Sequence, residues 1–259
     1  CCADHLMGPF LAIFLALTVG QPACAAAGEA ARYLGAGTCA ASNCHGSVTP
    51  RRDSPRSRQD EYITWFKRDR HAHAAAVLDE ERSLAIAHRL GMAERPADAA
   101  RCLDCHAVNA PTAERGARFD LRDGVSCEAC HGPAGGWIER HTEAGWTHAQ
   151  SVAAGMIDTR DAARGAEACF GCHLGDARKT VDHTLIAAGH PALVFELDTF
   201  AANLPPHWGE REENASWFRA GPWAVGQAMA LREAARRTAR QSRGGGWPEF
   251  SGYDCFACH

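Results

Sequence analysis

The sequence lacks a strong excess of charge of either sign. Its 27 basic and 31 acidic residues give a formal net charge of −4 over 259 residues, and this near-neutral balance argues against a nucleic-acid-binding protein. Charged residues make up 22% of the chain and hydrophobic residues 46%, which excludes a wholly disordered chain. Methionine is scarce, with four residues, whereas the chain has 13 cysteines and 14 histidines. So many cysteines are unusual for a cytosolic enzyme, and their spacing indicates their use.

A long hydrophobic run is missing as well. The apolar stretch Leu6–Val19 has 14 residues, which is too short to cross a bilayer. Gln21 and Pro22 end it, and the small residues at 23–27 offer a cleavage site typical of a secretory signal peptide. We therefore expect a signal peptide at residues 1–25 and a single domain at 26–259 that is truncated at its C-terminus. After cleavage we expect no membrane span and a periplasmic or extracellular location. An uncleaved membrane anchor is the alternative.

The ten cysteines that follow residue 25 all fall in pairs, and a histidine directly follows each pair. C-x-x-C-H is the attachment signature of c-type haem, in which each thiol forms a thioether with a haem vinyl group and the adjoining imidazole binds the iron. Four pairs have this form, and the first pair has two more residues between its cysteines. In chain order the five motifs are Cys39-Ala-Ala-Ser-Asn-Cys44-His45, Cys102-Leu-Asp-Cys105-His106, Cys127-Glu-Ala-Cys130-His131, Cys169-Phe-Gly-Cys172-His173 and Cys255-Phe-Ala-Cys258-His259.

Paired cysteines also occur in zinc sites, in thioredoxin-like redox pairs and in disulfides. None of these requires a histidine after every second cysteine, and chance would place one after all four C-x-x-C pairs only on the order of 1 in 10⁵ times. For the longer first motif, a disulfide between Cys39 and Cys44 is the alternative. The motifs therefore predict five c-type haems as cofactors.

Five haems in a chain of this length reduce the need for an ordinary aliphatic core, because the porphyrins supply the buried apolar surface. The expected fold class is mainly α with much irregular structure, a multihaem cytochrome c whose polypeptide wraps around a haem core. Residues Glu61–Leu90 are predicted to form two helices, and Pro222–Arg243 the longest helix. A further helix leads into Cys169, with Asp158 or Asp161 as its N-cap.

Each haem iron needs a second axial ligand or keeps an open position, and this choice separates an electron carrier from an enzyme. Only three methionines follow residue 25, so histidine is the stronger candidate. Apart from His5 and the motif histidines, enough histidines remain for every iron to bind two imidazoles. They are His71, His73, His88, His141, His148, His183, His190 and His207.

Three segments of the sequence occur together as a known pattern. They are Tyr33–Gly46, which includes the first motif, Trp65 followed by His71-Ala-His73, and Cys127–Pro133, which reads C-E-A-C-H-G-P. This pattern resembles the multihaem cytochromes related to cytochrome c-554, the tetrahaem electron carrier of ammonia-oxidising bacteria. The similarity covers about residues 33–200 and the last motif. The chain departs from the family in its longer first motif and in its fifth motif.

The resemblance also implies distal ligands. In the family these are a histidine shortly after the first motif, one about ten residues after C-H-G-P and one after the following motif. The resemblance further implies an open, five-coordinate haem at the position of His106. The matching distal positions here are His71, His141 and either His183 or His190. Of the last two, His190 is preferred because a proline fixes the backbone beside it. His148 is a further candidate.

The function we expect is electron transfer through the five haems, most of them held by two histidines, with redox proteins as donor and acceptor and no catalytic residues. One alternative is a multihaem oxidoreductase that acts on a small nitrogen or sulfur oxyanion at one five-coordinate haem, with His88 or His207 as proton donor. Another is a subunit of an extended haem polymer or an outer-membrane conduit.

Overall fold

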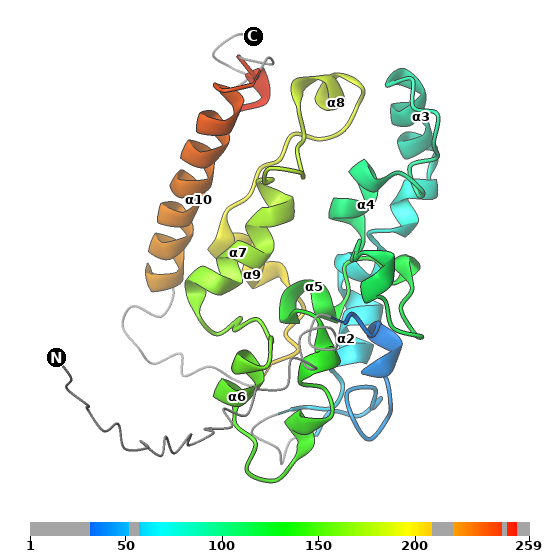
Figure 1. Cartoon of the computed structure of the whole chain (residues 1–259), viewed down its shortest axis with the longest axis vertical. Coiled ribbons are helices and arrows are strands. Elements are labelled where there is room, and N and C mark those ends of the chain that lie inside the picture. Colours follow the sequence, from blue (N-terminus) through cyan, green and yellow to red (C-terminus); the bar gives the residue numbers. More distant parts are fainter. Residues whose placement is uncertain (1–31, 52–56, 209–219, 245–247, 253–259) are drawn as a thin grey trace, which may run out of the picture.

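The computed structural model describes residues 32–51, 57–208, 220–244 and 248–252 (Figure 1). The expected signal peptide and the motif Cys255–His259 lie outside these residues. Within them the chain is helical and irregular, and the β structure consists of one isolated parallel bridge between Tyr33 and Arg115. The expected fold class, mainly α with much irregular structure, is confirmed.

Short helices joined by irregular segments make up the described chain. The α-helices are α2 (Glu61–Arg68), α3 (Glu81–Arg89), α4 (Ala100–His106), α5 (Cys127–His131), α6 (His148–Ala153), α7 (Ala162–His173), α8 (His183–Ala187), α9 (Leu197–Asn203) and α10 (Ala220–Gln241). The 3₁₀ helices are η1 (Ala36–Thr38), η2 (Arg70–His73), η3 (Ala76–Asp79), η4 (Thr112–Glu114), η5 (Leu121–Asp123), η6 (Ala134–Gly136), η7 (Arg140–Thr142) and η8 (Phe250–Gly252).

The predicted helices are present, with boundaries set by local chemistry. The helical segment after residue 60 splits into α2 and α3, and two 3₁₀ turns lie between them. Helix α7 begins after Asp161, whose carboxylate accepts a hydrogen bond from the Arg164 N–H at 2.8 Å, so Asp161 rather than Asp158 is the N-cap. Helix α10 has 22 residues and carries Pro222 in its first turn, where a missing N–H costs no hydrogen bond.

The longest helices pack together on one side of the molecule. Helix α10 lies along α7 and also contacts α9, whereas α3 and α4 lie on the opposite side (Figure 1). The core between the three helices is formed by Ala166, Phe170, Leu197 and Met229, and Cys169 packs against it. An ion pair between Arg232 and Glu167, with a nitrogen–oxygen distance of 2.9 Å, joins α10 to α7 at the surface.

Two smaller cores lie elsewhere, and each of them also contains a motif cysteine at its edge. Ala36, Trp65 and Ala72 form one, with Cys127 against it. Leu78, Leu103 and Ala107 form the other, with Cys102 against it. No large side chain in the described part of the chain is fully buried. The polypeptide therefore supplies three small apolar clusters around the cysteine motifs rather than one large core.

Candidate haem sites

Three of the motifs lie on helices that end at the motif histidine. Helix α4 ends at His106, α5 at His131 and α7 at His173. In an α-helix, residues three apart are neighbours on one face, so the two thiols of each C-x-x-C pair lie on the same side. The histidine in the next position completes a set of two sulfurs and one imidazole. The last turn of each helix thus presents the complete donor set that covalent haem attachment requires.

The first motif forms turns instead of a helix, which accommodates its two extra residues. The Cys44 N–H donates to the Ala41 carbonyl at 2.9 Å, and the His45 N–H donates to the Cys39 carbonyl at 3.2 Å. These bonds return the chain to Cys39, so the longer motif still presents both cysteines and the histidine together. All eight cysteines of the described ranges are free thiols, and the alternative Cys39–Cys44 disulfide is not formed.

A buried carboxylate ties the third motif to the segment that precedes the first. Glu128, which lies between Cys127 and Cys130, accepts backbone hydrogen bonds from Leu34 at 2.9 Å, Gly35 at 2.8 Å and Ala134 at 2.8 Å. Its exposed fraction is 4%, so these three N–H donors supply the hydrogen bonds that water would otherwise provide. The first and third motifs are therefore fixed to each other by this residue.

Three motif histidines face a second histidine from elsewhere in the chain. The ring centroids of His45 and His141 are 6.2 Å apart, and those of His71 and His173 are 6.0 Å apart. His106 and His190 are separated by 6.4 Å. A metal ion that bonds one nitrogen of each ring at about 2 Å would hold the two centroids roughly 6 Å apart. These separations therefore fit an iron held between the two imidazoles of each pair.

The ring nitrogens of these histidines are arranged consistently. In five of these six rings Nδ1 is hydrogen-bonded to an oxygen, which leaves Nε2 available as a ligand atom, and such partners are typical of metal-binding histidines. The His45 partner is Glu61 at 3.0 Å and the His71 partner is Asp69 at 2.9 Å. Backbone carbonyl oxygens accept from three other rings: that of Ala74 for His106, of Ile138 for His141 and of Pro191 for His190.

Two of these partners are carboxylates, and they change the electrostatics of their rings. Burial alone would raise the pKa of Glu61, but hydrogen bonds from His45, the backbone and Ser57 lower it to about 2. The same bond raises the pKa of His45, and the bond to Asp69 raises the pKa of His71. Both imidazoles thus donate from Nδ1 to an ionised carboxylate, which increases the electron density at Nε2.

The third motif histidine has different surroundings. Burial lowers the pKa of His131 to about 4, and interactions with His207, His45 and His148 lower it further. His207 follows α9, and its Nδ1 is 3.2 Å from the Pro205 carbonyl oxygen. Arg58 donates to the Pro206 carbonyl at 3.4 Å and so helps to hold this segment. No sequence pattern favours His207 as a ligand over the other histidines.

Among the described residues, the remaining predicted ligands make no ring contact with a motif histidine. The Nε2 atom of His148 is 2.9 Å from an Asp158 carboxylate oxygen, so the usual ligand atom already has a partner. His183 begins α8, and its ring lies 6.0 Å from that of Phe250 in η8, which precedes the last motif. The other two, His73 and His88, are exposed.

Sulfur atoms of different motifs contact one another. The Cys39 and Cys127 thiols are hydrogen-bonded, as are those of Cys105 and Cys172. The bond from Cys105, together with Lys179 whose ammonium nitrogen lies 3.3 Å from the sulfur, lowers the pKa of Cys172 to about 6. Helix α5 contacts α7, and the Cys130 thiol interacts with the two cysteines of α7. The motifs are therefore in contact in the order first, third, fourth and second.

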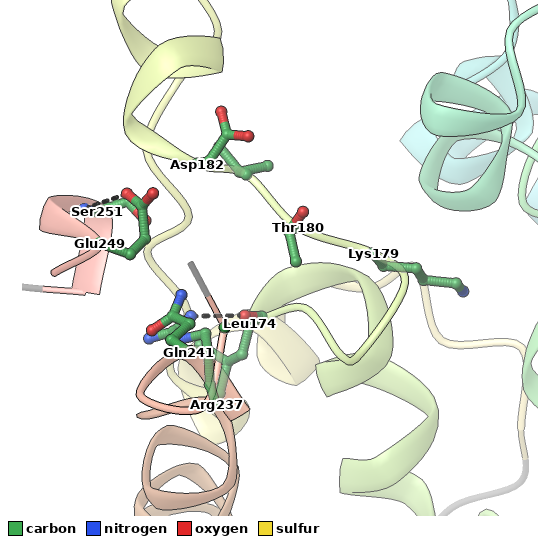
Figure 2. A pocket seen from close by; sticks show the side chains of 10 residues that line it. Leu174, Lys179, Thr180, Asp182, Arg237, Gln241, Glu249 and Ser251 are labelled. Carbon is green, nitrogen blue, oxygen red and sulfur yellow. Dashed lines mark hydrogen bonds between the residues drawn. The ribbon is translucent and has the colours of Figure 1, made fainter. Parts of the chain in front are cut away.

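A cavity of about 230 Å³ lies between the end of α7, the start of α8, α10 and η8 (Figure 2). Arg237 reaches across it from α10 and donates to the Leu174 carbonyl at 2.8 Å. Asp182, next to His183, and Glu249 also line it. In Figure 2 the Lys179 side chain extends away from the other labelled side chains. The cavity is thus next to the segment that leads into the last motif.

Several residues that hold the histidines carry no recognisable signal in the sequence. Glu61 and Asp69 are ordinary acidic residues until the fold places them against ring nitrogens, although Asp69 is only two positions from His71. Glu128 lies inside a haem motif, where any residue is allowed. These roles depend on contacts between distant parts of the chain.

Paired thiols next to histidine on helix ends, opposing imidazoles and a mainly α fold without a large core are together typical of c-type cytochromes. The family described as cytochrome c554 and c-prime matches residues 38–132, which include the first three motifs. The resemblance to the cytochrome c-554 family is thereby confirmed for this segment, and the family indicates multihaem electron transfer with covalently bound haem c. No curated protein and no solved structure matches the chain. None of the helices in the described ranges is long and apolar enough to cross a membrane.

Proposed function

We propose that the chain is a periplasmic or extracellular electron carrier with five covalently bound c-type haems, residues 1–25 being a signal peptide and 26–259 the haem-binding domain. Electrons enter from one redox protein and leave to another. The haems are held by the ten motif cysteines, with His45, His106, His131, His173 and His259 as proximal ligands.

The histidine pairs carry this proposal. His45–His141, His71–His173 and His106–His190 each have the separation that one iron between two rings requires. When bound, haem supplies a one-electron oxidation and reduction, and two imidazoles on its iron limit the rearrangement that accompanies it. A pair of protein ligands also leaves no position for a substrate. The pairs therefore favour a carrier over the oxidoreductase alternative.

The sulfur contacts support a particular order of sites along the molecule. The site of His45 neighbours that of His131 through Cys39 and Cys127. The site of His131 neighbours that of His173 through Cys130 and the cysteines of α7. The site of His173 in turn neighbours that of His106 through Cys172 and Cys105. The proposed electron path therefore runs through His45, His131, His173 and His106, an order different from that of the sequence.

For the two remaining sites we propose distal ligands from the second half of the chain. His207 is our candidate for His131, because its Nδ1 is bonded to a carbonyl oxygen and its Nε2 remains as a ligand atom. His148 does not suit it, since Asp158 holds its Nε2. His183 remains our candidate for the last motif, supported by its contact with Phe250 five residues before Cys255 and by the neighbouring cavity.

Reductive titration of the holoprotein tests the carrier function. The full chain is produced in a host with cytochrome-maturation machinery and titrated anaerobically with dithionite while the haem absorption bands are recorded. We expect the uptake of one electron per haem, complete reoxidation by ferricyanide, and no reoxidation by nitrite, hydroxylamine or sulfite above the rate in buffer. Sustained turnover of any of the three would contradict the carrier function and favour the oxidoreductase.

A further inference from the structure

His190 lies in a short turn after α8, and this turn is held from outside. The Gly189 backbone has a φ of +111°, a left-handed conformation that other residues rarely adopt. The His190 N–H donates back to the Leu185 carbonyl at 3.1 Å, and Nδ1 of its ring to the Pro191 carbonyl at 2.8 Å. The ring that faces His106 therefore belongs to a compact turn whose position depends on what packs against it.

Helix α3 is what packs against this turn. The Arg82 guanidinium donates twice to the Gly189 carbonyl, at 2.7 and 3.3 Å, and Arg89 donates to the Ala188 carbonyl at 2.9 Å. A Cβ atom at Gly189 would lie 3.0 Å from the Arg89 guanidinium and 3.6 Å from the Ile86 side chain. The two arginines thus satisfy carbonyls at the end of α8 that have no partner within the helix.

On the opposite side, His106 is held by α4 and by the segment that precedes η3. It ends α4, and its Nδ1 is 2.9 Å from the Ala74 carbonyl oxygen in the segment between η2 and η3. The His106 ring is therefore held by α4, the helix that also carries Cys102 and Cys105. The other ring is held through the turn, through α3 and through an ion pair at 3.0 Å between Arg101 of α4 and Asp182 at the start of α8.

We infer that Arg82 and Arg89 of α3 are positioning residues that hold His190 as the sixth ligand of the haem iron at His106. This inference rests on the proposed haem at this site. The resemblance to the cytochrome c-554 family implies an open iron here, and α3 is the element that closes it in this chain. Release of the two arginine contacts frees the turn, so the iron becomes accessible to a small exogenous ligand such as carbon monoxide.

The test is the spin state and carbon monoxide binding of holoprotein variants. In Arg82→Ala/Arg89→Ala we expect one haem per chain to change from low-spin to high-spin in the oxidised protein, and one equivalent of carbon monoxide to bind to the reduced protein, with the number of haems unchanged. Arg95→Ala, which removes an exposed arginine that pairs with Asp79 just before α3, is the matched control and leaves all haems low-spin. The conservative Arg82→Lys retains a charged donor and keeps the low-spin state.

A second variant tests the ligand directly, whether or not the arginine variants fold. His190→Gly should convert the same single haem to high-spin, and added imidazole should restore the low-spin spectrum. A double arginine variant with every haem low-spin would overturn the role of α3, and a His190→Gly variant with every haem low-spin would overturn the ligand. Neither failure touches the carrier function, because the reductive titration counts electrons per haem whichever haem is open.

Discussion

For a single histidine, the partner of one ring nitrogen determines what the other nitrogen can bind. His141 and His148 are seven residues apart; the resemblance matches His141 to a distal position and leaves His148 as a further candidate. Nδ1 of His141 is bonded to the Ile138 carbonyl and its ring faces His45, whereas Nε2 of His148 is bonded to Asp158. Only His141 therefore has a free Nε2 next to a motif histidine.

This difference gives a matched pair of substitutions. In His141→Ala we expect one low-spin haem to become high-spin, because the iron at His45 loses its second imidazole. In His148→Ala every haem stays low-spin. Electron paramagnetic resonance of the oxidised holoproteins measures both, with pyridine haemochrome as the check that the haem number is unchanged. Conversion in His148→Ala, or its absence in His141→Ala, would show that the ligand assignment is wrong.

At this scale the sequence predicts the residues whose spacing is set by covalent chemistry. Two sulfurs and an imidazole must reach one porphyrin, so Cys102, Cys105 and His106 are recognisable without a structure. The partner of His106 is 84 positions further along the chain. The proline beside His190 favours this residue as a ligand, but nothing local assigns it to His106. Carboxylates such as Glu61 are equally hidden, because their role arises only when distant segments meet.

Among the helices, α10 is held mainly by its contact with α7 and α9. Met229 is buried with an exposed fraction of 7% and packs with Phe170 and Leu197, whereas Leu231, two positions along the same helix, is 73% exposed. The cluster is small and can partly relax, so the loss of one of its side chains costs stability at the lower end of the range for a core residue.

Two alanine substitutions test this docking. We expect Met229→Ala to lower the free energy of unfolding by about 2 kcal/mol. Leu231→Ala should change it by less than about 0.5 kcal/mol, since its side chain is already in water. Denaturant unfolding of the two holoproteins, followed by circular dichroism, compares them on the same helix. Equal effects of the two substitutions would mean that α10 does not depend on this core.

The helices themselves were largely predictable, and their packing was not. Pro222 in a first turn, an acidic N-cap before α7 and the helix-prone segment after residue 60 are local signals, and the structure confirms them. The 3₁₀ turns between α2 and α3 and the contact of α3 with the turn at Gly189 depend on tertiary contacts that no local pattern encodes.

For the molecule as a whole, the buried apolar clusters are small, and each contains a motif cysteine at its edge. Such a chain depends on covalently bound porphyrins to complete its interior. The fold class follows from the sequence, because the five expected haems leave little space for another core. The order in which the motifs meet did not follow, since it arises from sulfur contacts between residues far apart in the sequence.

The most direct test of covalent attachment at all five motifs is peptide mass spectrometry of the pigmented holoprotein after extraction with acidified acetone. We predict five haem-bearing peptides, one for each cysteine pair from Cys39–Cys44 to Cys255–Cys258, each heavier than its sequence by one haem. A colourless protein, pigment lost to the solvent, or motif peptides with free or disulfide-bonded cysteines would contradict the account.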